Sequence, residues 1–232
     1  MFISLKKALV FAAAASICLF AAGCGNSSDS ASSSSSKDAN KEITVGVTPG
    51  FHADVMEQVK KEAAKQGILI KVIEFSDYVT PDVALSNKEI DMNSYQHKPY
   101  MDNMVKDKGL KLVSIGQTVV APIGLYSHKI KSLDELKDGA VVAIPNDPTN
   151  GARGLLLLQK AGLIKVKDGV KYPTPADVAE NPKHLQFREL EAAQIPRSLD
   201  DVDLAAVNTN YALEAGIDPV KDALFREDKD SP

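Results

Sequence analysis

Residues 140–162 read AVVAIPNDPTNGARGLLLLQKAG, and this stretch contains the pattern that decides the fold. A short apolar run ends at Pro145, a polar turn follows, and a leucine-rich segment then stops at Gly162. The pattern predicts a buried strand, a loop over residues 146–150 and a helix over about 151–161. Arg153 would then lie in the first turn of the helix.

The alternation of strand and helix continues along the rest of the chain. Apolar runs predict further strands, and Thr-Pro or capping-box starts with glycine stops predict further helices. The connections are too long for hairpins, which indicates an α/β fold with mostly parallel sheets. The expected strands are residues 43–47, 68–75, 90–92, 185–190 and 203–208; the expected helices are 53–66, 99–107, 192–200 and 211–215, with shorter ones opening at Thr80, Ser132 and Thr174.

The segment over residues 110–127 is expected to run extended for an unusual length between two such sets of elements. We interpret it as a crossover between two α/β lobes, with Pro122 and Gly124 at the crossing. This interpretation divides the body into a first lobe over residues 42–121 and a second lobe over residues 122–232.

The N-terminus has the features of a bacterial lipoprotein signal peptide. Lys6 and Lys7 precede an apolar run over residues 8–22, which is short for a transmembrane helix. The run ends in AAGC, and these small residues before Cys24 resemble a lipobox, with alanine where leucine is usual. We therefore expect residues 1–23 to be removed and Cys24 to be acylated. A plain signal peptide with an incidental cysteine is the alternative.

Residues 24–41 are predicted to form a flexible tether. Eight of the fourteen residues from Ser27 to Asn40 are serine, so this stretch has little to bury. The two cysteines of the chain, Cys18 and Cys24, both come before the body, which therefore has no thiol and no disulfide. Loss of the two signal lysines changes the formal charge from −4 to −6, which gives no reason to expect nucleic acid as a partner. The body is expected at the extracytoplasmic face of the cell membrane.

Aromatic, amide and imidazole side chains gather directly after the predicted strands. Open parallel sheets bind ligands beyond the carboxyl ends of their strands, and this mixture suits a small ligand with polar and apolar parts. Taken singly, an aromatic ring is more often core, and an asparagine can simply cap the following helix. The candidate residues are Phe75, Tyr78, Tyr95, His97, Asn150, Asn208 and Asn210.

Arg153 is the most informative single residue, and two interpretations of it stay open at this point. A guanidinium beside a helix N-terminus can bind a carboxylate through two parallel hydrogen bonds. It can equally be a solvated surface residue with a weak ion pair. The position alone does not favour one over the other.

Motifs of catalysis and of metal binding are missing from the sequence. We find no GxSxG, GxGxxG, GxxxxGK[ST], HExxH or CxxC pattern, and the four histidines show no HxxxH spacing. A site made of paired carboxylates has no spacing rule and stays open. These observations favour a binding protein over an enzyme, without a cofactor or a metal.

Three stretches resemble the methionine-binding lipoproteins of ABC importers, the NlpA family. They are DMNSYQHKPYMD (91–102), SLDELKDGAVVAIPNDPTNGARGLLLLQKAGLI (132–164) and LEAAQIPRSLDDVDLAAVNTNYALEAG (190–216). The resemblance runs from about Glu42 to the end of the chain, and IPNDPTN and NTNYA are its most specific motifs. It implies a two-lobed periplasmic-binding-protein-like fold of type 2, no enzymatic activity, and a monomer that delivers methionine to a membrane permease and its ATPase.

The resemblance also implies roles for the candidate residues. Arg153 would pair with the ligand carboxylate, and Asn208 and Asn210 would serve the amino-acid head group. The aromatic residues and His97 would surround the thioether chain, which is polarizable and packs well between rings. Two departures stand out: the segment usually of the NEGR type is Asn-Gly-Ala-Arg here, and the relatives continue beyond Pro232 with a strand that returns to the first lobe.

Three other functions remain as alternatives at the level of the sequence. The protein could bind another small carboxylate ligand, it could be an extracytoplasmic hydrolase that uses carboxylates or His97, or it could be a surface adhesin with a vestigial pocket.

Overall fold

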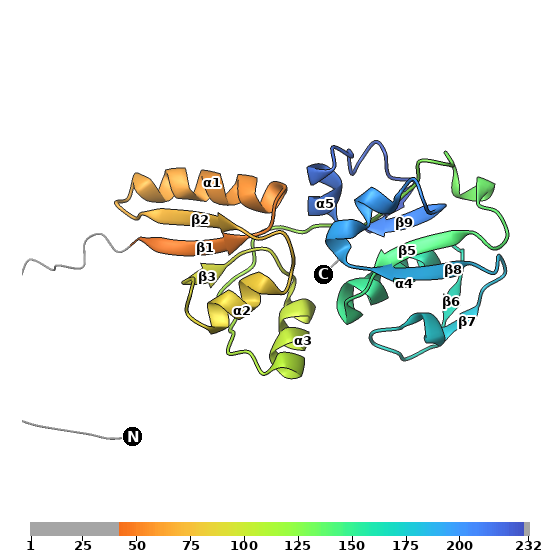
Figure 1. The fold of residues 1–232 in the computed structure, drawn as a ribbon, viewed down its shortest axis with the longest axis horizontal. Helices are drawn as coiled ribbons and strands as arrows, with labels where there is room; N and C mark the ends of the chain where they lie inside the picture. Colours follow the sequence, from red (N-terminus) through yellow and green to blue (C-terminus); the bar gives the residue numbers. More distant parts are fainter. Residues whose placement is uncertain (1–41, 230–232) are drawn as a thin grey trace, which may run out of the picture. The chain divides into compact units, whose positions relative to one another are not determined.

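The computed structural model of the chain describes residues 42–229, which form two lobes, each built on its own sheet (Figure 1). The expected signal peptide and tether lie outside the described residues. The expected boundary between residues 121 and 122 falls in an irregular segment between the two sheets, and its position stays a prediction.

The first lobe contains a parallel three-stranded sheet in the order β2-β1-β3. The first predicted strand is confirmed, and its residues Val45 and Val47 are fully buried and pack with Met56. Helix α1 lies along one side of this sheet, and α2 lies on the other (Figure 1). The elements are β1 (Ile43–Val47), α1 (Phe51–Ala64), β2 (Ile70–Glu74), α2 (Thr80–Ser86), β3 (Met92–Asn93) and α3 (Lys98–Lys108).

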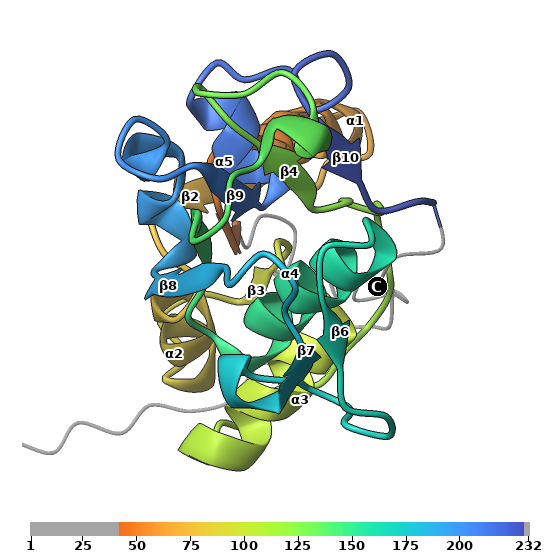
Figure 2. The same cartoon turned by 90° about the vertical axis from the view of Figure 1, so that its right-hand side faces the viewer.

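The second lobe contains a five-stranded sheet in the order β10-β4-β9-β5-β8. β5 pairs in parallel with β8 and β9, whereas β4 is antiparallel to both of its neighbours. A separate antiparallel pair, β6 with β7, lies beside α4 (Figure 2). The elements are β4 (Gly124–Tyr126), β5 (Val141–Pro145), α4 (Pro148–Lys160), β6 (Lys165–Val166), β7 (Val178–Glu180), β8 (Gln186–Leu190), β9 (Leu204–Val207), α5 (Thr209–Glu214) and β10 (Phe225–Arg226).

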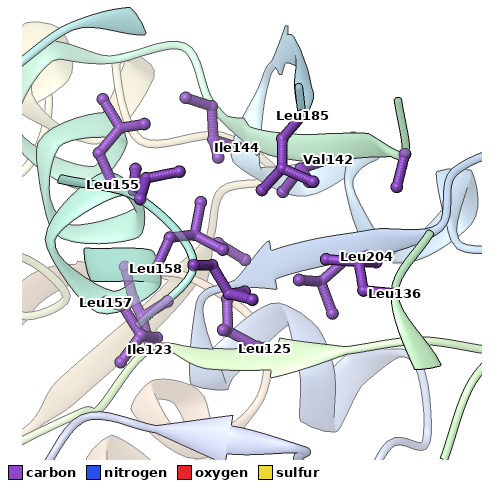
Figure 3. Packing of buried hydrophobic residues seen from close by; sticks show 14 of the residues in the cluster. Ile123, Leu125, Leu136, Val142, Ile144, Leu155, Leu157, Leu158, Leu185 and Leu204 are labelled. Atoms are coloured by element: carbon purple, nitrogen blue, oxygen red, sulfur yellow. The ribbon is translucent and has the colours of Figure 1, made fainter. Parts of the chain in front are cut away.

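The leucines of α4 form the centre of the largest core. Leu155 and Leu158 are fully buried and pack among residues of β4, β5 and β9, as Figure 3 shows. Leu156 points away and is 40% exposed, as the helical period requires. Burial of one leucine side chain contributes about 1.5–3 kcal/mol, so this face holds α4, and the residues at its N-terminal end, firmly against the sheet.

Three of the predicted helices are 3₁₀ turns in the structure. Residues 192–200 form two short 3₁₀ turns, Ala192–Gln194 and Pro196–Ser198, instead of one helix. Pro196 has no N–H to continue the hydrogen-bond pattern, which explains the break. The helix expected after Thr174 is a single 3₁₀ turn, Pro175–Asp177, and the one expected at Ser132 is also a 3₁₀ turn, Leu133–Glu135.

The long connection between the lobes contributes less to the sheets than predicted. Of residues 110–127, only the three residues of β4 are part of a strand, and residues 111–120 are largely exposed. Val113 and Ile115 are 78% and 80% exposed. The end of the connection is held by the second lobe, because Arg153 donates a hydrogen bond to the carbonyl oxygen of Ala121 and Thr209 donates one to that of Pro122.

Candidate ligand-binding site

The side chain of Asn150 lies at the centre of the polar cluster where the two lobes meet. Asp147 is the N-cap of α4 and accepts hydrogen bonds from the backbone N–H groups of Thr149 and Asn150. The other oxygen of Asp147 accepts a hydrogen bond from Nδ2 of Asn150 at 2.9 Å. This contact fixes the amide orientation, so that Oδ1 of Asn150 is free to accept hydrogen bonds from elsewhere.

Three donors converge on this one oxygen atom. His97 contributes Nε2 at 3.1 Å, Asn208 contributes Nδ2 at 3.0 Å, and Arg153 contributes Nη1 at 3.3 Å. An amide oxygen has two lone pairs, so the three donors are not all fully satisfied. Oδ1 of Asn150 therefore has more donors around it than it can fully accept from.

His97 joins the first lobe to this cluster and is held in one tautomer. It is the N-cap of α3, and its Nδ1 accepts a hydrogen bond from the backbone N–H of Tyr100 at 3.1 Å. The proton must then be on Nε2, which donates to Asn150. Burial lowers the pKa of His97, and the nearby guanidinium of Arg153 lowers it further. The imidazole is therefore neutral at pH 7.

Arg153 is farther inside its helix than the sequence predicted. Helix α4 begins at Pro148, so Arg153 is in the second turn, and the N–H groups of the first turn are capped by Asp147. Its Nε lies 3.1 Å from Oε1 of Glu227 and its Nη2 lies 2.5 Å from Oε2. Both groups are largely buried, which answers the open question: Arg153 is not a solvated surface residue.

Asn208 and Asn210 are both buried, and each has one side-chain atom without a partner among the described residues. The hydroxyl of Tyr78 donates to Oδ1 of Asn210 at 2.6 Å, which leaves Nδ2 of Asn210 without an acceptor. Nδ2 of Asn208 donates to Asn150, which leaves Oδ1 of Asn208 without a donor. Thr48, at the end of β1, is fully buried and its hydroxyl is also without a partner there. Buried polar atoms of this kind require an explanation, and a bound ligand is one.

Four tyrosines form the aromatic part of the site. The ring of Tyr78 lies 5.8 Å from that of Tyr95, 5.9 Å from that of Tyr100 and 5.0 Å from that of Tyr211. Tyr95 donates to the carbonyl oxygen of Tyr78 at 2.5 Å. Burial raises the pKa of Tyr78 and of Tyr95 well above the ordinary value, so both hydroxyls remain donors.

A pocket of about 610 Å³ opens beside these rings. Of the predicted site residues, Tyr78 is the one that lines it, and the pocket reaches the polar cluster through Asp147, which accepts a hydrogen bond from Asn150. Phe75 is apart from both, because its ring packs over Gly46 in the first sheet. The pocket is lined by Ser76, Asp77, Tyr78, Val79, Tyr100, Asn146, Asp147, Glu191, Ala192, Ala193 and Tyr211.

The sequence did not single out several residues that build this site. Asp147 and Glu227 orient Asn150 and Arg153, and Tyr211 donates a hydrogen bond to the carbonyl oxygen of Ser76 at 3.2 Å. Tyr211 was within reach of prediction, because it follows Asn210 at the end of a strand. Glu227 is 74 residues from Arg153, and no local pattern marks it.

Two α/β lobes that meet through polar and aromatic side chains define a substrate-binding protein of the periplasmic-binding-protein type. More specifically, the chain belongs to the NlpA lipoprotein family, whose model matches residues 43–232. It is 55% identical over 215 residues to the D-methionine-binding lipoprotein MetQ of Salmonella typhi, a match that covers 91% of this chain and 76% of the relative.

Solved structures support the same assignment. The chain is similar to an ABC transporter periplasmic substrate-binding protein from Coxiella burnetii, with 50% identity, a TM-score of 0.80 and coverage of 82% of this chain and 81% of that one. It is equally similar to a nutrient-binding protein from Burkholderia cenocepacia bound to methionine, with 51% identity, a TM-score of 0.80 and coverage of 82% and 81%. The expected fold class is confirmed.

The family is one of binding proteins, so the protein is not an enzyme, and the hydrolase alternative is set aside. Over residues 42–229, no group of three or more His, Cys, Asp or Glu side chains could hold a metal ion. Over the same residues, no helix is long and apolar enough to cross a membrane.

Proposed function

We propose that this protein binds methionine, as the L- or D-isomer, or a close relative of it, between its two lobes and delivers it to an ABC permease with its ATPase. The observation that carries the proposal is the pairing of unsatisfied groups at Asn208 and Asn210. A buried acceptor (Oδ1 of Asn208) and a buried donor (Nδ2 of Asn210) lie two residues apart in the chain. An amino-acid head group carries one cation and one anion and would satisfy both.

The ligand carboxylate would be held on the donor-rich side of the cluster. Arg153, Asn150 and Asn210 are the proposed partners, since the guanidinium still has hydrogen atoms on Nη1 that Glu227 does not engage. The ammonium group would take Oδ1 of Asn208. His97 would support Asn150 from the first lobe.

The side chain of the ligand would extend into the aromatic region. A thioether makes favourable contacts with aromatic rings, and Tyr78 and Tyr95 present rings near the head-group site. Phe75 stays a proposed contact of the side chain, although its ring packs over Gly46. The size and the aromatic lining of the neighbouring pocket leave room for a longer relative, such as a methionyl dipeptide.

The route to the membrane is part of the proposal. We expect acylation of Cys24 and the serine-rich tether to keep a monomeric body at the extracytoplasmic face of the cell membrane, where it can reach the permease. Release of the ligand would follow opening of the lobes. Loss of membrane association in Cys24→Ala, with normal ligand binding, would support this arrangement.

The proposal is tested by calorimetry and thermal unfolding of the detergent-solubilised full chain. The panel is L-methionine, D-methionine, a methionyl dipeptide, norleucine, which lacks the sulfur, and methioninol, which lacks the carboxylate. A ligand at about 100 times its Kd should stabilise the protein by about 2.7 kcal/mol. If the protein unfolds cooperatively and no methionine compound binds or stabilises it, the proposal is refuted. Turnover of a compound would instead support the hydrolase alternative.

Arg153→Ala should lose about 2–5 kcal/mol of binding free energy, the range for truncating one member of a buried charge pair. Arg188→Ala is the matched control, because Arg188 lies on β8 in the same lobe and is exposed. Equal affinity in both variants would remove Arg153 from the site.

A further inference from the structure

Gly50 lies at the end of the first lobe that faces helix α5. It is the N-cap of α1, with φ 82° and ψ −146°, and its carbonyl oxygen accepts hydrogen bonds from the N–H groups of Ala53 and Asp54. This backbone conformation is populated almost only by glycine. The backbone conformation thus gives one reason for glycine at position 50.

The second reason is the closeness of the other lobe. A Cβ atom placed on Gly50 would lie 2.6 Å from the carbonyl oxygen of Asn210 and 3.2 Å from both its Cα and its carbonyl carbon. Ordinary contacts of a Cβ atom begin at 3.4 Å. The obstructing atoms are backbone atoms of a helix, so they cannot rotate away as a flexible side chain could. Only a shift of α5 or of the whole lobe would relieve the overlap.

Gly50 is distinctive among the glycines of residues 42–229 in this respect. Where a Cβ atom would be crowded at Gly46, Gly124, Gly151 or Gly154, every obstructing atom belongs to the same lobe as the glycine. At Gly50 the obstruction comes from the other lobe. The constraint therefore acts on the approach of the lobes and not on the packing inside one of them.

The same region holds the hydrogen bonds that connect the lobes. Asn210 accepts a hydrogen bond from the hydroxyl of Tyr78 at 2.6 Å, and the neighbouring Tyr211 donates to the carbonyl oxygen of Ser76 at 3.2 Å. Hydrogen bonds weaken steeply as they lengthen beyond these distances. A separation large enough to admit a methyl group at Gly50 would therefore weaken both.

We propose that Gly50 is the residue that sets how closely the two lobes approach, because the absence of a side chain there lets the backbone of α1 rest on the backbone of Asn210. A methyl group at this position holds the lobes apart and weakens the Tyr78–Asn210 and Tyr211–Ser76 contacts. The expected effect on methionine affinity rests on the proposed function. The expected effect on the contacts between the lobes is independent of it.

The test compares Gly50→Ala with Gly67→Ala by hydrogen exchange of the full chain, with and without L-methionine. Gly67 also has a positive φ, of 76°, but a Cβ atom there would meet no atom within 4 Å. Gly67→Ala is therefore the same substitution at another residue of positive φ, but without a contact to the other lobe. In Gly50→Ala we expect faster exchange in residues 76–80 and 208–212 than in Gly67→Ala, and methionine affinity lower by about tenfold or more, which corresponds to 1.4 kcal/mol.

Equal exchange of these two segments in both variants, in either condition, overturns the proposal. If the wild-type chain binds no compound of the panel, the proposed function fails, while the comparison without ligand still decides the role of Gly50. If Gly50→Ala does not unfold cooperatively, the wild-type chain supplies the test. Saturating methionine must then protect residues 50–54 and 208–212 together, and protection of one segment alone contradicts the proposal.

Discussion

The carboxylate of Glu227 lies side by side with the guanidinium of Arg153, with Nε 3.1 Å from Oε1 and Nη2 2.5 Å from Oε2. Oε2 also accepts the backbone N–H of Ile123 at 2.7 Å, and Nη2 donates to the carbonyl oxygen of Ala121. One ion pair therefore joins α4, the end of the chain crossing between the lobes, and the segment after β10. It also partly neutralises the charge that would attract a ligand carboxylate.

Glu227→Gln should therefore separate the effect of this ion pair on ligand affinity from its effect on stability. The amide keeps an acceptor for the guanidinium but removes the negative charge, so affinity should rise for methionine relative to methioninol, which has no carboxylate. Stability should fall, and loss of one member of a buried ion pair costs up to about 3–5 kcal/mol. Calorimetry with the two ligands and thermal unfolding measure these changes. An unchanged ratio of the two affinities would place the ligand carboxylate away from Arg153.

Tyr78→Phe should lower methionine affinity and leave the fold intact. The substitution removes the donor to Oδ1 of Asn210 and leaves that buried oxygen without a partner, a loss of about 1–3 kcal/mol. Titration calorimetry gives the affinity directly.

Tyr126→Phe is the matched control for this prediction. Tyr126 is 2% exposed, and its hydroxyl has no hydrogen-bond partner among the described residues. Removal of this hydroxyl should leave affinity unchanged and keep or raise the melting temperature. Equal affinity losses in the two variants would mean that the Tyr78–Asn210 contact has no special role.

Asp82→Asn should stabilise the protein at neutral pH. Asp82 is fully buried, its Oδ1 accepts hydrogen bonds from Asn93 and Gln96, and its Oδ2 has no partner among the described residues. Burial is the main reason that its pKa is raised above the ordinary 3.8. The folded state thus retains the proton to higher pH than the unfolded state, and the free energy of unfolding falls as the pH rises through this window.

An asparagine keeps the accepting oxygen without the charge, so Asp82→Asn should have a higher free energy of unfolding than wild type at pH 7. Urea unfolding at several pH values between 4 and 7 measures it. A variant less stable than wild type at pH 7 would show that the ionised carboxylate is favourable in its place.

Two partly buried histidines should make the protein less stable in mild acid. Burial lowers the pKa of His52 from 6.5 to about 4 and also lowers that of His97. The unfolded state therefore binds protons first, so the stabilisation is complete above about pH 6.5 and is lost as the pH falls towards 4. For His52, a pKa lowered from 6.5 to about 4 corresponds to a loss on the order of 3 kcal/mol.

His52→Phe and His97→Asn should each flatten this part of the stability curve, measured by denaturant unfolding between pH 7 and 4.5. His184→Gln is the control, since its side chain is 77% exposed. Stability curves as steep as that of the wild type in both the His52 and the His97 variant would assign the acid sensitivity to carboxylates.

The regular elements could be predicted because their signals are local. The run of apolar residues in β5 and the alternation in β1 each mark a strand, and Pro145 does close its strand. The start of α4 was misplaced by three residues because Asp147, and not a later residue, caps the helix. That small shift moved Arg153 out of the first turn and changed its chemistry.

The site was predictable as a list of residues but not as a network. Seven of the eight candidates are linked by hydrogen bonds in two groups. Tyr78 is bonded to Tyr95 and Asn210, and Asn150 is bonded to His97, Arg153 and Asn208. These partners are separated by up to 132 residues, and sequence spacing contains no information on such pairs. The role of Glu227 could not be foreseen for the same reason.

The pairing of β4 with β10 has a consequence for how this chain acquires its fold. Leu125 of β4 lies opposite Phe225 of β10, so β4 pairs with a strand about a hundred residues later in the chain. Sheets closed by such distant segments fold slowly, because loop-closure entropy is lost before the contacts form. Until residues 225–226 are made, β4 lacks one of its two neighbouring strands. We expect maturation to be limited by the arrival of residues 225–226 and not by the formation of α4.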